Sequence, residues 1–95
     1  MTDIELARSL KRLRRTVLML QTELRHGHVD EELIATIEQQ MENGIATDGR
    51  SENLRTLVDA LRESTLTPRS ELFTDTIRAC EKVKDAIEGV MSTIG

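Results

Sequence analysis

Residues 6–24 read LARSLKRLRRTVLMLQTEL, and the large apolar side chains in this stretch recur at alternating intervals of four and three. This is the a/d spacing that places one continuous apolar stripe along an α-helix of about three heptads. Such a stripe is stable in water only when other helices cover it. The stripe, called the leucine seam below, consists of Leu6, Leu10, Leu13, Val17, Leu20 and Leu24.

The leucine seam has two interpretations. In the first, the seam is one wall of the chain's own core, with the last helix packed antiparallel on it. In the second, the seam faces another chain as a coiled coil, because an a/d stripe is narrower than the usual core face of a helix. Leu18 and Met19 lie on a different side of the same helix and widen its apolar surface. We therefore expect a homodimer or a tight complex with another protein, with the seam as the partner or dimer interface.

The composition predicts an all-α protein with a single helical domain over residues 1–95. A chain of 95 residues is too short for two separate cores. Hydrophobic residues make up 38% of the chain and Phe73 is the one aromatic residue, so the core must be aliphatic. The β-branched residues do not alternate with the period of two that a half-buried strand requires.

Capping signals divide the chain into four helices. Thr2 and Glu5 have the spacing of a capping box, and Gly27 suits the left-handed position just after a helix end. Asp30 is a typical N-cap for the second helix, and Asn43-Gly44 ends that helix.

The second half of the chain carries similar signals. Asp48 or Ser51 caps the third helix, and Thr67-Pro68 begins the fourth, with proline at the first helical position. Two long helices therefore bracket two short ones in a four-helix bundle. The expected helices span residues 3–26, 31–43, 51–63 and 68–93.

The net charge of −4 is unevenly distributed along the chain. Residues 1–28 carry six Lys or Arg against three Asp or Glu, whereas residues 29–95 carry seven against fourteen. The sharpest basic cluster lies opposite the seam on the first helix, and it is either a solvated surface or a face that selects a partner. Arginine pairs bidentately with the carboxylates of a protein or the phosphates of a nucleic acid. We expect a charged, partner-selecting face made of Lys11, Arg12, Arg14 and Arg15.

Residues 33–62 loosely fit a helix-turn-helix. Arg50, Asn53 and Arg55, near the start of its second helix, are residue types that contact base edges. Acidic residues share that helix, and the connection is longer than the usual three or four residues. A small dimeric DNA-binding regulator using residues 45–62 is therefore the alternative to a protein-binding function.

The sequence contains no complete catalytic motif, and we expect no cofactor. His26 and His28 do not converge on a metal without a specific turn, so we expect no metal site. Cys80, the only cysteine, falls on the apolar stripe of the last helix, which predicts a buried thiol and excludes an intramolecular disulfide. A cysteine-poor chain with no signal peptide and no apolar run long enough to span a bilayer is expected in the cytoplasm.

These features favour a small non-enzymatic protein–protein interaction module that binds a partner protein through helix–helix contacts. In outline the chain resembles small acidic helical regulators and adaptors of bacteria, such as anti-activators and connector proteins, and small chaperones of export systems. A helical-bundle enzyme with a site at a dimer junction is the third hypothesis. We expect a protein partner rather than nucleic acid or a membrane.

Overall fold

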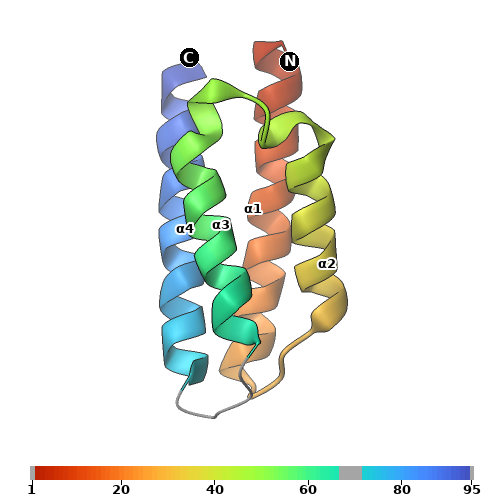
Figure 1. The fold of residues 1–95 in the computed structure, drawn as a ribbon, viewed down its shortest axis with the longest axis vertical. Helices are drawn as coiled ribbons and strands as arrows, with labels where there is room; N and C mark the ends of the chain where they lie inside the picture. Colours follow the sequence, from red (N-terminus) through yellow and green to blue (C-terminus); the bar gives the residue numbers. More distant parts are fainter. Residues whose placement is uncertain (1, 67–71, 95) are drawn as a thin grey trace.

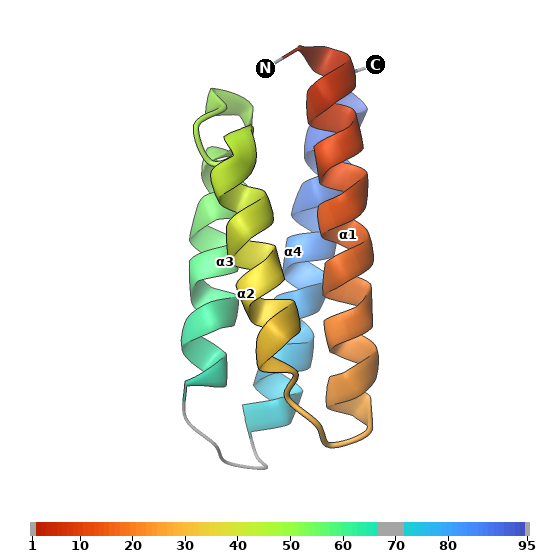
Figure 2. The ribbon, with the colours of Figure 1, turned by 90° about the vertical axis from the view of Figure 1, so that its right-hand side faces the viewer.

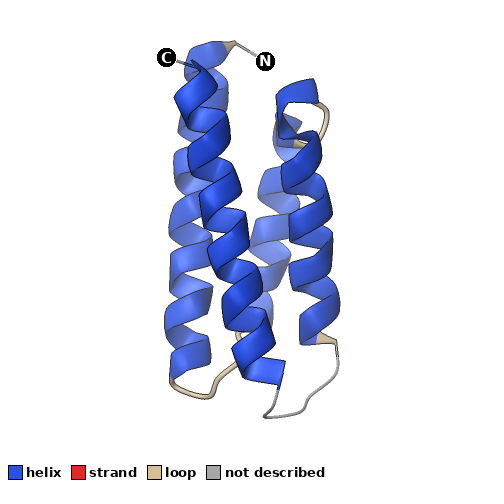
Figure 3. Ribbon diagram, turned by 90° about the vertical axis from the view of Figure 1, so that its left-hand side faces the viewer, coloured by secondary structure: helices blue, strands red, loops and turns tan. Residues whose placement is uncertain are grey.

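The computed structural model describes residues 2–66 and 72–94, and these form helices and the connections between them, with no strand (Figure 3). Four α-helices run up and down a molecule that measures 40 × 20 × 19 Å (Figure 1). This confirms the prediction of an all-α arrangement of four helices that pack as a bundle. The helices are α1 (Asp3–Arg25), α2 (Glu31–Gln40), α3 (Glu52–Thr65) and α4 (Leu72–Ile94).

The two long helices, α1 and α4, lie side by side along most of their length. Helix α2 packs against α1, and α3 packs against α4, so the two short helices form a second layer (Figure 2). The first turn of α1 and the last turn of α4 lie at the same end of the bundle (Figure 1). All four helices therefore contribute to one elongated interior.

Both ends of α1 have the predicted caps. The Thr2 hydroxyl accepts a hydrogen bond from the backbone N–H of Glu5 at 3.2 Å. At the other end, Gly27 has a φ of 78°, and the N–H of His28 donates to the carbonyl of Glu23 at 2.9 Å. This bond spans five residues around a left-handed glycine, as in a Schellman motif. The chain thereby leaves α1 and turns back toward α2.

Helix α2 begins at the predicted cap and ends through a different turn. The Asp30 carboxylate accepts hydrogen bonds from the backbone N–H groups of Glu32 and Leu33 at 3.0 and 3.2 Å. After Gln40 the helix runs into a π-type turn, Met41–Ile45. The predicted end lies inside this turn, where Gly44 has a φ of 104°.

The connection to α3 selects one of the two predicted caps. The Asp48 carboxylate accepts from the backbone N–H of Arg50 at 2.9 Å, in the 3₁₀ turn Gly49–Ser51 that leads into α3. The Ser51 side chain makes no capping bond and is buried. The predicted start of the last helix at Thr67-Pro68 lies outside the described residues.

The leucine seam faces inward. Each of its side chains is at most 2% exposed, and the seam belongs to one core with buried side chains of the other three helices. The structure therefore shows the first interpretation, in which the seam is a wall of the chain's own core. The assignment of the seam as a partner or dimer interface is corrected, because the chain's own helices already cover Leu6, Leu10, Leu13, Val17, Leu20 and Leu24. Dimerisation itself stays a prediction.

Gln21 is a polar side chain buried between α1 and α4. It is 2% exposed, and its Nε2 donates to Oε1 of Glu81 at 2.6 Å. This bond and the neighbouring ammonium of Lys84, 3.0 Å from the same oxygen, hold the pKa of Glu81 below its usual range. A buried amide needs such a partner, and this bond joins α1 to α4.

Candidate functional site

The side of α1 that points away from the core carries cations and exposed apolar side chains. Residues 6–22 contain five Lys or Arg and no Asp or Glu. Ile4, Leu18 and Met19 are 68%, 37% and 50% exposed. The α1 outer face, as the term is used below, consists of Ile4, Arg8, Lys11, Arg12, Arg15, Leu18 and Met19, all of which are exposed.

Of the four predicted cations, three lie on the α1 outer face and one does not. Lys11, Arg12 and Arg15 lie on the α1 outer face and form no ion pair with any described residue. Arg14 turns toward α4, where its Nη2 lies 3.1 Å from Oε1 of Glu88. Sequence reasoning missed Arg8, although its spacing of three, four and seven residues from Lys11, Arg12 and Arg15 marks the same side of a helix.

The cations on this face do not stabilise the helix that carries them. Like charges three or four residues apart on a helix destabilise it by about 0.2–0.5 kcal/mol per pair. Lys11 and Arg12 follow Arg8 by three and four residues, and Arg15 follows them by four and three residues. The fold therefore gives no stability reason for gathering them. What the arrangement can do chemically is bind several anionic groups at once.

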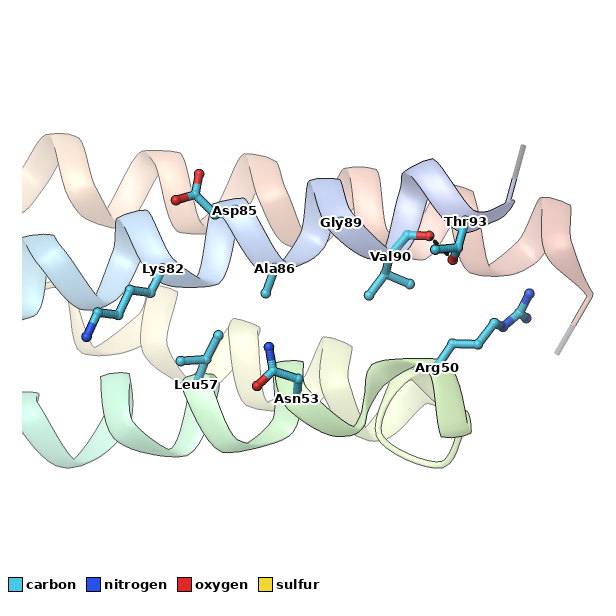
Figure 4. A pocket seen from close by; sticks show the side chains of 9 residues that line it. All are labelled: Arg50, Asn53, Leu57, Lys82, Asp85, Ala86, Gly89, Val90 and Thr93. Carbon is cyan, nitrogen blue, oxygen red and sulfur yellow. Dashed lines mark hydrogen bonds between the residues drawn. The ribbon is translucent and has the colours of Figure 1, made fainter.

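A second candidate surface is an open groove of about 780 Å³ between α3 and α4 (Figure 4). Its middle is apolar, with Leu57 on one side and Val90 on the other, and its charged residues have both signs. Because the signs are mixed, the groove has less charge selectivity than the α1 outer face. Its lining residues are Arg50, Asn53, Leu57, Lys82, Asp85, Ala86, Gly89, Val90 and Thr93.

Gly89 lies in the interior of α4, and a Cβ added there meets no atom within 4 Å. We expect Gly89→Ala to raise the free energy of unfolding by about 0.5–1 kcal/mol, because alanine loses less backbone freedom in a helix. Urea unfolding measures the change. Gly27→Ala is the matched control: at φ 78° an alanine is strained, so this variant should be less stable than the wild type. A destabilised Gly89→Ala would contradict the open groove.

Arg50 is anchored at the end of the bundle. Its Nη1 lies 2.8 Å from Oδ1 of Asp3 in α1, and its Nη2 lies 3.0 Å from Oδ2 of Asp48. Its Nε also donates to Oδ1 of Asp48 at 3.1 Å. The hydrogen bonds from the side chain and the backbone N–H of Arg50 lower the pKa of Asp48 from 3.8 to about 2. Arg50 therefore ties the connection before α3 to the start of α1.

This pKa predicts a pH dependence. Because the pKa of Asp48 is lower in the folded than in the unfolded chain, its ionised form stabilises the fold above pH 3.8, and this stabilisation is lost as the pH falls toward 2. A carboxyl-carbon NMR titration should give Asp48 a midpoint near 2 in the native protein. In Arg50→Gln the midpoint should move back toward 3.8, since the guanidinium is gone. A native midpoint at 3.8 would refute the anchor.

The residues proposed for DNA contact lie in a different geometry from the one predicted. In a helix-turn-helix the second helix crosses the first at about 90–120°. Helices α2 and α3 instead run antiparallel, and Nη1 of Arg62 lies 3.3 Å from Oε1 of Glu38 across them (Figures 1 and 2). The guanidinium of Arg50 is already bound to two carboxylates. Asn53 and Arg55 remain exposed.

The remaining chemical candidates are separate from one another. Nδ1 of His26 lies 2.8 Å from the carbonyl of Thr22, at the end of α1, and His28 is exposed. Cys80 is 0% exposed in the core. Within residues 2–66 and 72–94, no three His, Cys, Asp or Glu side chains are grouped to hold a metal ion. In the same residues no helix is both long and apolar enough to cross a membrane.

Comparisons of the chain with protein-family models, with curated proteins and with solved structures gave no match.

Proposed function

We propose that the protein is a small, non-enzymatic interaction module that binds another protein through the α1 outer face. The observation that carries the proposal is that exposed Leu18 and Met19 share one helix face with cations that have no partner among the described residues. The inner face of α1 is already occupied by the core, so the two sides of this helix serve different purposes. The buried side of α1 stabilises the fold, and the exposed side binds a partner.

The apolar and the charged residues of the α1 outer face contribute differently to binding. Fully burying a Leu or Met side chain contributes about 1.5–3 kcal/mol, and Leu18 and Met19 have part of that burial still to gain. Ion pairs at the edge of such a contact add little affinity but steer the encounter and reject partners of the same charge. The face therefore suits a specific complex whose strength comes from apolar contact and whose selectivity comes from charge.

Affinity capture from the native host, with the full chain as bait and mass spectrometry as readout, identifies the bound protein. Its affinity is then measured for Lys11→Glu/Arg15→Glu and for the matched control Arg55→Glu/Arg78→Glu. Both double variants lower the net charge equally, and all four positions are exposed. We expect the first to weaken binding at least about tenfold and the control to change it less than about threefold. Equal losses, or an unchanged first variant, would refute the proposed surface.

A further inference from the structure

We infer that the α1 outer face fits a helix that is acidic in the middle and apolar toward both ends. This inference rests on the proposed function and specifies the chemistry of the partner. It follows from the spacing of the exposed residues, from the sign of their charges and from what surrounds α1.

The exposed residues of α1 repeat every seven positions. Ile4, Lys11 and Leu18 form one row, and Arg8, Arg15 and Thr22 form a second row beside it. All six are exposed. Residues seven apart lie on one line of an α-helix, so the two rows mark a strip of α1 along which a second helix can lie. Unlike a coiled-coil seam, this strip holds charged as well as apolar side chains over its roughly three heptads.

The rows place apolar and charged groups at different heights. At a rise of about 1.5 Å per residue, Ile4 and Leu18 are about 21 Å apart along the axis, and the span from Arg8 to Arg15 between them is about 10 Å. A facing helix therefore meets apolar side chains near its two ends and guanidinium and ammonium groups in the middle. Carboxylates at the facing central positions are the groups that complement them.

A second copy of this chain does not fit through the same face. In a parallel pair in register, Lys11, Arg12 and Arg15 face the same cations of the other copy, and in an antiparallel pair centred near Lys11 the two cation clusters also overlap. Like charges placed opposite one another reject such a pairing. The occupant is therefore a helix with carboxylates in that region and not the α1 outer face of a second copy.

The helix next to α1 disfavours a broad anionic surface. Helix α4 exposes Glu81, Asp85 and Glu88 along with the cations Arg78 and Lys82, so its surface has mixed charge, and Glu88 already pairs with Arg14 of α1. A DNA duplex or an anionic bilayer wide enough to cover α1 also approaches these carboxylates. A helix about 10 Å across lies along α1 alone. Exposed Leu18 and Met19 also offer apolar contact that phosphate groups do not use.

The test uses the full chain and a stapled helical peptide of about 21 residues, or three heptads, with leucine facing Ile4 and Leu18 and glutamate facing the cations between them. Its counterpart has lysine in place of each glutamate. Fluorescence anisotropy measures binding at low and high salt. We expect the glutamate peptide to bind at least about tenfold more tightly than the lysine peptide, with affinity that falls as salt rises.

Two variants of the protein separate specific packing from general charge attraction. Lys11→Glu/Arg15→Glu should weaken binding of the glutamate peptide at least about tenfold, and Arg55→Glu/Arg78→Glu should weaken it less than about threefold. Leu18→Ser should weaken it about threefold or more, because an apolar contact is lost without any change of charge. Unchanged affinity in Leu18→Ser would overturn the apolar part of the inference. No preference for glutamate over lysine would overturn all of it.

Duplex DNA and vesicles of phosphatidylcholine with phosphatidylserine serve as competing probes. Binding of either as tight as that of the glutamate peptide would overturn the inference in favour of a phosphate surface. Failure here remains distinct from failure of the proposed function. If the captured protein requires Lys11 and Arg15 but the glutamate peptide does not bind, the proposed function stands and the acidic helix is wrong. If the captured protein binds the Lys11→Glu/Arg15→Glu variant as tightly as the wild type, the proposed function is wrong.

Discussion

Leu13→Ala is expected to lower the free energy of unfolding by about 2–5 kcal/mol, because Leu13 is 0% exposed in the middle of the leucine seam and its loss leaves a cavity in a packed core. Leu18→Ala removes the same atoms five residues later on the outer side of α1, where the side chain is 37% exposed. That variant should stay within about 1 kcal/mol of the wild type. Urea unfolding of the two variants compares the two faces of one helix.

The same experiment distinguishes an intramolecular core from a seam shared by two chains. If the seam is covered by its own chain, the unfolding midpoint does not depend on protein concentration, because folding is then unimolecular. A midpoint that rises steadily with concentration, with a large effect of Leu13→Ala only at high concentration, would show that a second chain covers the seam. Equal effects of the two substitutions would contradict the orientation of α1.

Cys80 is expected to react with a thiol reagent at least about 10³-fold more slowly in the native protein than in the unfolded chain, since labelling requires the core to open. The thiol is 0% exposed on α4. Burial raises its pKa from 9.0 to about 12, although the charge of Lys84 acts in the opposite direction. At pH 8 the native thiol is therefore almost wholly protonated and also shielded from the reagent.

The control places a thiol on the surface of the same protein. Leu66 follows α3 and is 70% exposed, so Leu66→Cys in a Cys80→Ala background should react at about the rate of an unfolded chain. Rapid labelling of Cys80 in the native wild type would contradict the packing of α4. It would also revive a role for this residue as a nucleophile.

The helices of this fold follow from local sequence signals, whereas the use of the leucine seam does not. Thr2, Gly27 and Asp30 act within a few residues of themselves, so the sequence predicts their caps. The a/d period of the seam states that the stripe must be covered but not by which helix, because an intramolecular and an intermolecular neighbour require the same spacing. Only the arrangement of α2 and α4 decides between them.

The polar details of the candidate site depend on contacts distant in sequence. Arg14 turns from the predicted cation face to pair with Glu88 on α4, and the buried Gln21 donates a hydrogen bond to Glu81. No pattern near either residue in the sequence predicts these two contacts. Helical spacing alone, by contrast, suffices to place Arg8, Lys11 and Arg15 on one side of α1.

The central claim is that one side of α1 is buried in the chain's own core and the other side is exposed to bind a partner. Solvent paramagnetic relaxation in methyl-detected NMR tests this claim most directly. With a soluble gadolinium chelate added, the methyl signals of Ile4, Leu18 and Met19 should broaden strongly. Those of Leu6, Leu13 and Leu20 should remain sharp in a sample whose sedimentation gives the mass of one chain. Broadened seam methyls, or seam methyls protected only when the mass is that of two chains, would contradict the account.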